Sequence, residues 1–104
     1  MQNKILRVAL IGVGNMGKKY AQMIVSGEVA NMKLTAVVIR RDELMEWGEA
    51  LVNVDGGHVR IFRSADDMFK AEDVDTLFDA VIIATPHKTH KELALKAFAK
   101  GKAV

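Results

Sequence analysis

Three glycines, Gly12, Gly14 and Gly17, stand at the spacing GxGxxG, directly after an apolar run and directly before an amphipathic segment. In a strand–turn–helix unit, this spacing lets the chain reverse, lets the backbone approach a pyrophosphate, and lets helix and strand pack closely. The free N–H groups at the helix start and the helix dipole then favour a diphosphate. We therefore predict a dinucleotide site here, with a purely steric glycine turn as the alternative. The expected cofactor contacts in this segment are Gly12, Val13, Gly14, Asn15, Met16 and Gly17.

A second group of candidate binding residues follows the apolar run 79–85. Pro86 ends that run, because proline cannot donate to a sheet ladder and disfavours helix just before it. Either His87 or His90, near the expected start of the last helix, could contact the nicotinamide ribose. A neutral histidine near a helix start, without a ligand, is the alternative for each. The expected contacts in this group are Thr85, Pro86, His87 and His90.

The residues after the second apolar run bear on which dinucleotide binds. An NAD site usually carries a carboxylate at this strand end, where it accepts a hydrogen bond from the ribose 2′-hydroxyl. Here Ile39 stands in that place, and Arg40 and Arg41 follow it. Guanidinium groups suit a phosphate through charge-assisted and often bidentate hydrogen bonds. We therefore expect NADP(H), bound by the two arginines. In the alternative, Asp42 serves the ribose and the cofactor is NAD(H).

The composition excludes other classes of site. The 104 residues include no cysteine, which removes disulfides, thiolate nucleophiles and cysteine metal ligands. None of the three histidines forms a pair with metal-ligand partners of suitable spacing, and His58 is expected at a strand start. The formal charge of +2 is spread along the chain, and the first apolar run is short and contains Arg7. We therefore expect no metal, no nucleic acid and no membrane as partners, and a cytoplasmic location by default.

Strands and helices must alternate to position these residues. Strands are predicted at 4–11, 32–39, 58–62 and 79–85, the first two of the buried type, with a turn at 53–57. Helices are predicted at 16–25, from Asp42 to about Val52, after Ser64, and from about His90 to Gly101. Asp42 is a predicted helix cap, and Ser64/Asp67 and Thr89/Glu92 are predicted capping boxes. Gly27 and Gly101 are predicted helix ends. The predicted apolar stripe of the last helix is Leu93, Ala94, Ala97 and Phe98.

This alternation predicts an α/β fold, a Rossmann-type doubly wound parallel sheet of strand order 3-2-1-4 with right-handed crossovers. Ligands in such sheets bind outside the carboxyl ends of the strands, where the strand order reverses. That point lies between the first and fourth strands. The glycine turn and Thr85 are therefore expected to meet at one crevice.

Two longer stretches, ALIGVGNMG and DAVIIATPHKTHKELALKAFAKGKAV, with a second strand ending near Arg40, resemble the N-terminal half of the Gfo/Idh/MocA oxidoreductase family. In that family the fourth strand typically runs into a Thr-Pro-Asn-x-x-His element and a helix ending in Gly-Lys. The chain departs from this pattern at His87, which replaces the asparagine. The matching positions are Thr85, Pro86, His90, Gly101 and Lys102.

The resemblance implies a two-domain enzyme that transfers hydride between a nicotinamide cofactor and a sugar, polyol or related carbonyl substrate. Residues 1–104 would be its dinucleotide-binding domain, a fragment cut at the start of a fifth strand and before an α+β domain that holds the substrate. The family's catalytic lysine, in a Glu-Lys-Pro motif, lies beyond the position of Val104. We therefore expect no catalytic residue within 1–104, and no activity from this part alone.

Two other functions fit the residues. One is a stand-alone nucleotide-sensing module of a regulator, and the other is a reductase domain of the dihydrodipicolinate or homoserine dehydrogenase type.

For the cofactor-domain interpretation, an unpaired, apolar fourth strand at the sheet edge leads us to expect a homo-oligomer.

Overall fold

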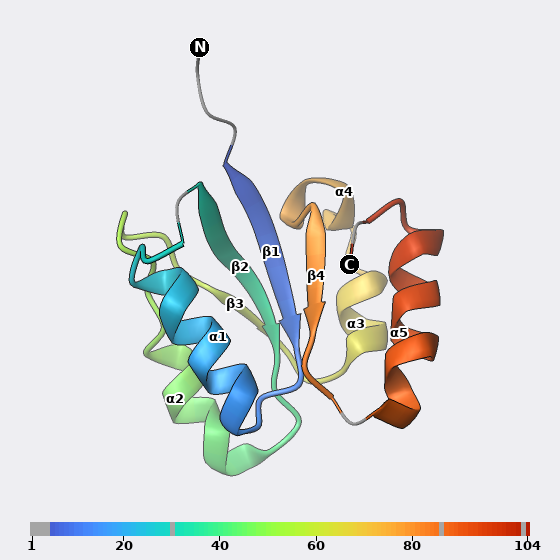
Figure 1. Ribbon diagram of the computed structural model, residues 1–104, viewed down its shortest axis with the longest axis horizontal. Helices are drawn as coiled ribbons and strands as arrows, with labels where there is room; N and C mark the ends of the chain where they lie inside the picture. Colours follow the sequence, from blue (N-terminus) through green and yellow to red (C-terminus); the bar gives the residue numbers. More distant parts are fainter. Residues whose placement is uncertain (1–4, 30, 86, 103) are drawn as a thin grey trace.

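The computed structural model describes residues 5–29, 31–85, 87–102 and 104, which form a parallel sheet covered by helices (Figure 1). The strand order across the sheet, β3-β2-β1-β4, is the predicted one, and every strand pair is parallel. The elements along the chain are β1 (Leu6–Ile11), α1 (Asn15–Val25), β2 (Met32–Val38), the 3-10 turn η1 (Asp42–Leu44), α2 (Met45–Glu49), β3 (Arg60–Phe62), α3 (Ala65–Phe69), α4 (Val74–Leu77), β4 (Ala80–Ile83) and α5 (His87–Ala99).

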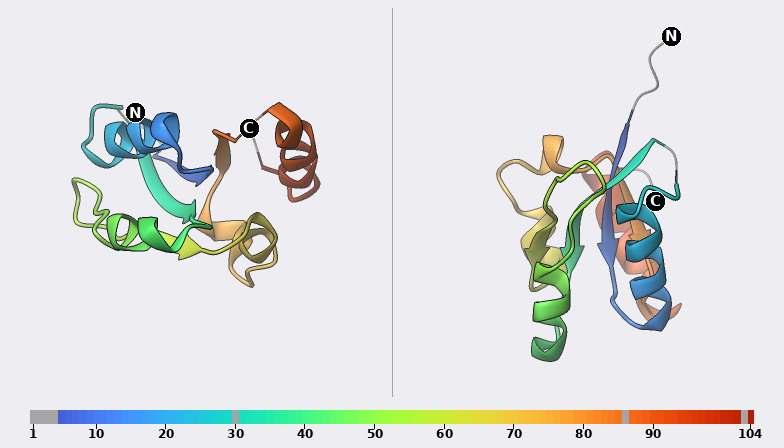
Figure 2. Two further views of the ribbon diagram at one scale, coloured as in Figure 1. Left: turned by 90° about the horizontal axis from the view of Figure 1, so that it is seen from below. Right: turned by 90° about the vertical axis from the view of Figure 1, so that its left-hand side faces the viewer.

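The sheet separates two apolar cores. Alternate residues of β1 point to opposite faces, so that Ala9 and Ile11 join one cluster and Leu10 joins the other. Helices α3, α4 and α5 cover the first cluster, while α1 and α2 cover the second. Figure 2 shows these two groups of helices on opposite sides of the sheet. Because both faces are covered, β1 is buried from Val8 to Ile11, as its unbroken apolar sequence predicts.

The predicted turn at 53–57 is confirmed, and one buried amide attaches it to the sheet. The Asn53 side chain is 5% exposed. Its Nδ2 donates to the Leu34 carbonyl at 2.7 Å, and its Oδ1 accepts from the Leu34 N–H at 3.1 Å. Nδ2 also donates to the Gly57 carbonyl at 3.0 Å. The side chain therefore satisfies the backbone of β2 in the way that a neighbouring strand would.

Several helix signals are confirmed. The Ser64 hydroxyl accepts a hydrogen bond from the Asp67 N–H at 3.1 Å and so caps α3. Gly27 and Gly101 follow α1 and α5 with φ of +85° and +74°, which glycine adopts without steric cost. Among the described residues, no helix is long and apolar enough to cross a membrane.

The last helix differs from its prediction in its start and in its buried stripe. It begins at His87, so Thr89 lies inside the first turn and cannot be its N-cap. Its buried stripe is Leu93 and Ala97, which are four residues apart. Phe98 lies one position further round and is 58% exposed, so its place in the predicted stripe is wrong.

Two further expectations in the middle of the chain are wrong. Asp42 is the first residue of η1 and does not cap it, because its carboxylate pairs with Arg63. The following helix ends at Glu49, so Val52 lies outside it and instead forms an isolated bridge with His58. The stretch 70–78, for which no helix or strand was predicted, contains α4 and the fully buried Phe78.

A guanidinium–carboxylate pair joins the beginnings of β1 and β4. Arg7 donates from Nη2 to Asp79 Oδ1 at 2.8 Å, from Nε to Oδ2 at 3.1 Å, and from Nη1 to the Thr76 carbonyl. The backbones of Arg7 and Asp79 are also hydrogen-bonded to the partner residue. The hydrogen bond to Asp79 raises the pKa of the Arg7 guanidinium.

The Arg7→Met variant is expected to have a clearly lower melting temperature, because it leaves the Asp79 carboxylate and the Thr76 carbonyl without this donor. Circular dichroism melting measures the effect. The matched control is Arg60→Met, which removes a more exposed pair with Asp73 and is expected to cost less. Equal decreases of the melting temperature in the two variants would show that the Arg7–Asp79 pair contributes no more to stability than the exposed Arg60–Asp73 pair.

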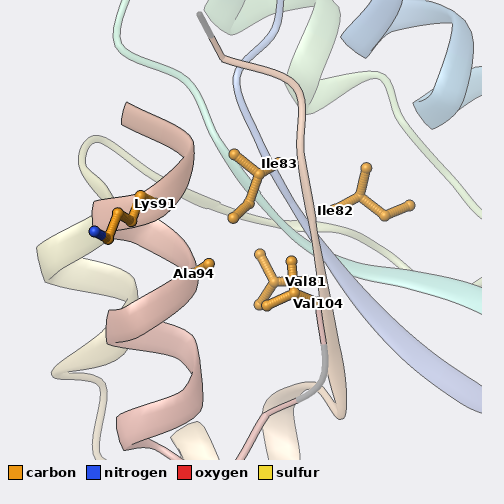
Figure 3. A pocket seen from close by; sticks show the side chains of 6 residues that line it. All are labelled: Val81, Ile82, Ile83, Lys91, Ala94 and Val104. Carbon is orange, nitrogen blue, oxygen red and sulfur yellow. The ribbon is translucent and has the colours of Figure 1, made fainter. Parts of the chain in front are cut away.

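The outer edge of β4 faces an apolar groove. Among the described residues, β4 pairs with β1 and has no strand on its other side. A groove of about 430 Å³ lies between this edge and α5. Figure 3 shows Val81 and Ile83 of β4 facing Ala94 of α5 across it, with Val104 at one end. An unpaired apolar edge of this kind favours pairing with another chain.

The chain is therefore expected to self-associate through the β4 edge at high concentration, as measured by light scattering. Ala94→Lys places a charge in the groove and should shift the chain toward monomer. Leu95→Lys is the matched control, since Leu95 is 58% exposed and does not line the groove. A wild-type chain that stays strictly monomeric would refute this expectation.

Candidate functional site

The turn after β1 packs directly on the end of β4. Gly12 has φ of +96°, and a Cβ on it would lie 2.8 Å from Thr85 Cγ2 and 2.9 Å from the Ala84 carbonyl carbon. Only glycine fits this position, for its backbone angle and for its space. The glycine turn and the end of β4 therefore meet at the carboxyl edge of the sheet, as the strand order predicts.

The other two glycines of the turn have different surroundings. A Cβ on Gly17 would collide with the Gly12 carbonyl oxygen, so this glycine lets α1 begin tightly against the turn. A Cβ on Gly14 would meet nothing within 4 Å, and Gly14 has no positive φ. Its backbone stands at the N-cap of α1 and is exposed. Space and backbone angle therefore do not explain a glycine at position 14, whereas a ligand lying against its backbone does.

The beginning of α1 suits an anion. Its first turn contains no acidic residue, and the Lys18 ammonium group lies 5.7 Å from the centre of the Trp47 ring on α2. A free helix N-terminus carries partial positive charge on its N–H groups, so a basic first turn is unfavourable unless a negative group binds there. The open backbone at Gly14 leaves room for a diphosphate to approach these N–H groups.

The remaining candidate residues lie in the turn itself, at the start of α1, at Thr85 and in the first turn of α5. Val13 and Thr85 are partly buried, and Thr85 lies next to Gly12. Asn15 and Met16 begin α1, and His87 and His90 lie in the first turn of α5, which follows the carboxyl end of β4. Pro86 lies outside the described residues. The backbones of both helix starts thus reach the carboxyl edge of the central strands (Figure 1).

The two candidate arginines lie at the neighbouring end of β2. Ile39 is fully buried, and a Cβ on Gly48 of α2 would collide with Ile39 Cδ1. Arg40 and Arg41 follow it and are exposed. Arg41 Nε lies 3.7 Å from a Glu43 carboxylate oxygen, with both side chains about 70% exposed, so this pair is weak. No partner of the Arg40 guanidinium is found in the described part of the chain.

A third arginine, Arg63, belongs to the same cluster and was missed by the sequence prediction. Its Nη2 donates to the Arg40 carbonyl at 3.1 Å and to Asp42 Oδ1 at 2.5 Å. The predicted strand order contained the signal, because Arg63 follows β3 and the ends of β2 and β3 are neighbours. Three guanidinium groups and two carboxylates, those of Asp42 and Glu43, therefore gather at this corner.

The chain is similar in sequence to known dehydrogenases. Residues 6–104 match the model of a family described as an oxidoreductase family with an NAD-binding Rossmann fold. Inositol 2-dehydrogenase of Rhodococcus erythropolis is 32% identical over 102 residues, which are 98% of this chain and 27% of that protein. Inositol 2-dehydrogenase 4 of Saccharopolyspora erythraea is 35% identical over 102 residues, 97% of this chain and 27% of the relative. The chain thus spans about a quarter of the length of these relatives.

A solved structure has the same architecture. Scyllo-inositol dehydrogenase from Lactobacillus casei with bound cofactor NAD(H) and scyllo-inositol has a TM-score of 0.78 and 27% sequence identity, over 95% of this chain and 26% of that one.

Substitutions at the glycines should separate ligand binding from folding. Gly14→Ala is expected to leave the melting temperature nearly unchanged, because the new methyl group enters open space, yet to weaken binding of a dinucleotide at least tenfold by obstructing the diphosphate. Gly17→Ala should instead lower the melting temperature. Calorimetric titration and thermal melting measure the two effects. Full binding by Gly14→Ala would show that no ligand approaches this backbone.

Proposed function

Because the chain belongs to the Gfo/Idh/MocA family of oxidoreductases, we propose that residues 1–104 are the cofactor domain of a longer, two-domain NADP(H)-dependent dehydrogenase. The observation that carries the proposal is the open backbone at Gly14, beside a turn that packs on Thr85. Tight packing explains Gly12 and Gly17, but it does not explain Gly14. A pyrophosphate resting on the N–H groups at the start of α1 accounts for Gly14.

Each part of the site has a role in this proposal. The backbone from Gly12 to Gly17 binds the diphosphate. Thr85 and the beginning of α5, with His87 and His90, border the nicotinamide half. A bound nicotinamide accepts or donates the hydride. No residue of 1–104 is assigned a catalytic role, and acid–base groups and the substrate pocket are assigned to the second domain.

The substrate is proposed to be a polyol or sugar, oxidised at a secondary alcohol or reduced at the matching ketone. This rests on the relatives, since both reported sequence relatives are named as inositol 2-dehydrogenases, and the reported structure contains scyllo-inositol. The chain spans about a quarter of the length of those proteins, and we assign substrate binding to the part beyond it. The proposal is therefore limited to the class of substrate.

The residues at the end of β2 support the proposed preference for NADP(H) over NAD(H). Where an NAD site usually carries a carboxylate, the chain has the buried Ile39. Arg40 comes next, exposed and without an ion-pair partner among the described residues. A 2′-phosphate offers Arg40 a charge-assisted pair, whereas a 2′-hydroxyl does not. The related structure from Lactobacillus casei contains NAD(H), so the proposed preference for NADP(H) would set this chain apart from that protein.

Arg40→Ala is expected to weaken NADPH binding by about 1.5 to 3 kcal/mol, as for a hydrogen bond to a charged group, while NADH binding stays nearly unchanged. Quenching of Trp47, the single tryptophan, measures both affinities. Lys70→Ala, which removes an exposed cation at the far end of α3, is the control and should change neither. Equal losses for both cofactors in Arg40→Ala would contradict the NADP(H) preference.

A further inference from the structure

Arg63 stands where two strand ends meet. Parallel pairing places Val38 of β2 opposite Phe62 of β3, and the Ile39 N–H continues the pairing by donating to the Phe62 carbonyl at 2.8 Å. Residues after these positions therefore emerge side by side at the carboxyl edge of the sheet. Arg63 is the first residue beyond β3 and directly precedes Ser64, the N-cap of α3. Its backbone is thus fixed on both sides.

One nitrogen of Arg63 is hydrogen-bonded to the segment between β2 and η1. Nη2 donates to the Arg40 carbonyl at 3.1 Å and to Asp42 Oδ1 at 2.5 Å. The two bonds span the backbone from residue 40 to residue 42, between β2 and η1. The Asp42 carboxylate is thereby held by a cation, although its side chain is 91% exposed.

Asp42 is the acidic group of this segment that bears on the choice between a ribose 2′-hydroxyl and a 2′-phosphate. The usual acidic position at the end of β2 is taken by Ile39, which packs against α2 and is fully buried. A carboxylate in this region favours a ribose 2′-hydroxyl, as acceptor, and repels a 2′-phosphate. Unpaired, Asp42 would work against Arg40. Paired with Arg63, its charge is offset and its Oδ1 is occupied.

We infer that Arg63 is a positioning residue that sets cofactor selectivity by holding Asp42 away from the ribose. This inference rests on the proposed NADP(H) preference and adds the residue that maintains it. An exposed ion pair contributes little to folding stability, so variants at Arg63 should remain folded. The effect of Arg63 is therefore to be measured in ligand selectivity.

The experiment compares two probes that differ by one group, adenosine 2′,5′-bisphosphate and adenosine 5′-monophosphate, with NADPH and NADH as the full cofactors. Selectivity is the dissociation constant of the ligand without the 2′-phosphate divided by that of the ligand with it, within each pair. Arg63→Gln is expected to lower this ratio at least tenfold, through weaker binding of the 2′-phosphorylated ligand and unchanged or tighter binding of the other. Asp42→Asn should raise it severalfold.

A double-mutant cycle tests whether Arg63 acts through Asp42. In the Asp42→Asn background, Arg63→Gln should lose most of its effect on the ratio, because no carboxylate remains to be held. Arg63→Lys, which keeps the charge, should restore part of the selectivity. Arg60→Gln is the matched control, since this arginine of β3 pairs with Asp73 and should leave the ratio unchanged.

The outcomes separate this inference from the proposal beneath it. If the wild-type chain prefers the ligands without the 2′-phosphate, the NADP(H) preference and the inference both fall. If the wild-type chain prefers the 2′-phosphorylated ligands and Arg63→Gln keeps the ratio, only the inference falls. The same result follows if Arg63→Gln acts equally strongly with and without Asp42, because Arg63 would then act independently of that carboxylate.

Discussion

The packing of the β1–α1 turn on the end of β4 is the constraint on which the site depends. At Gly12 there is no room for a Cβ, because Thr85 and the Ala84 carbonyl already occupy that space. At Gly17 the same turn meets the beginning of α1. The two contacts fix where the helix begins and which way its N–H groups point. The open space at Gly14 is therefore a defined feature of the sheet edge, and its position follows from the pairing of β1 with β4.

The sequence predicted those parts of the structure that depend on short-range pattern. The glycine spacing, the buried strands and the alternation of strands with helices were enough to derive the strand order and to bring residue 12 beside residue 85. The Ser64 cap was also predictable, since the capped N–H lies only three residues away. In each case the physical cause lies within one element or in a general rule for parallel sheets.

Features that depend on partners distant in sequence were not predictable in this way. Asp42 has the residue type of a helix cap, but Arg63, 21 residues further on, takes its carboxylate. Phe98 fits an apolar stripe by spacing, but helix α5 turns Leu93 and Ala97 inward instead. Arg63 reaches Asp42 because the ends of β2 and β3 lie side by side. The predicted strand order placed these ends together but did not select this side-chain pair. Side-chain pairing at the corner of a sheet needs coordinates, because many residue types satisfy the same local pattern.

The division of the interior into two cores has an evolutionary consequence. The arginines at 40, 41 and 63 follow Ile39 of the core under α1 and α2 and Phe62 of the core under α3 to α5, whereas the groove beside β4 lies on the α5 side of the sheet. The sheet separates this groove from the helices that pack on Ile39. Mutations that adapt the β4 side to a new neighbour can therefore accumulate without repacking the helices behind Ile39. One scaffold of this kind can vary its outer edge and the ends of β2 and β3 independently as sequences diverge.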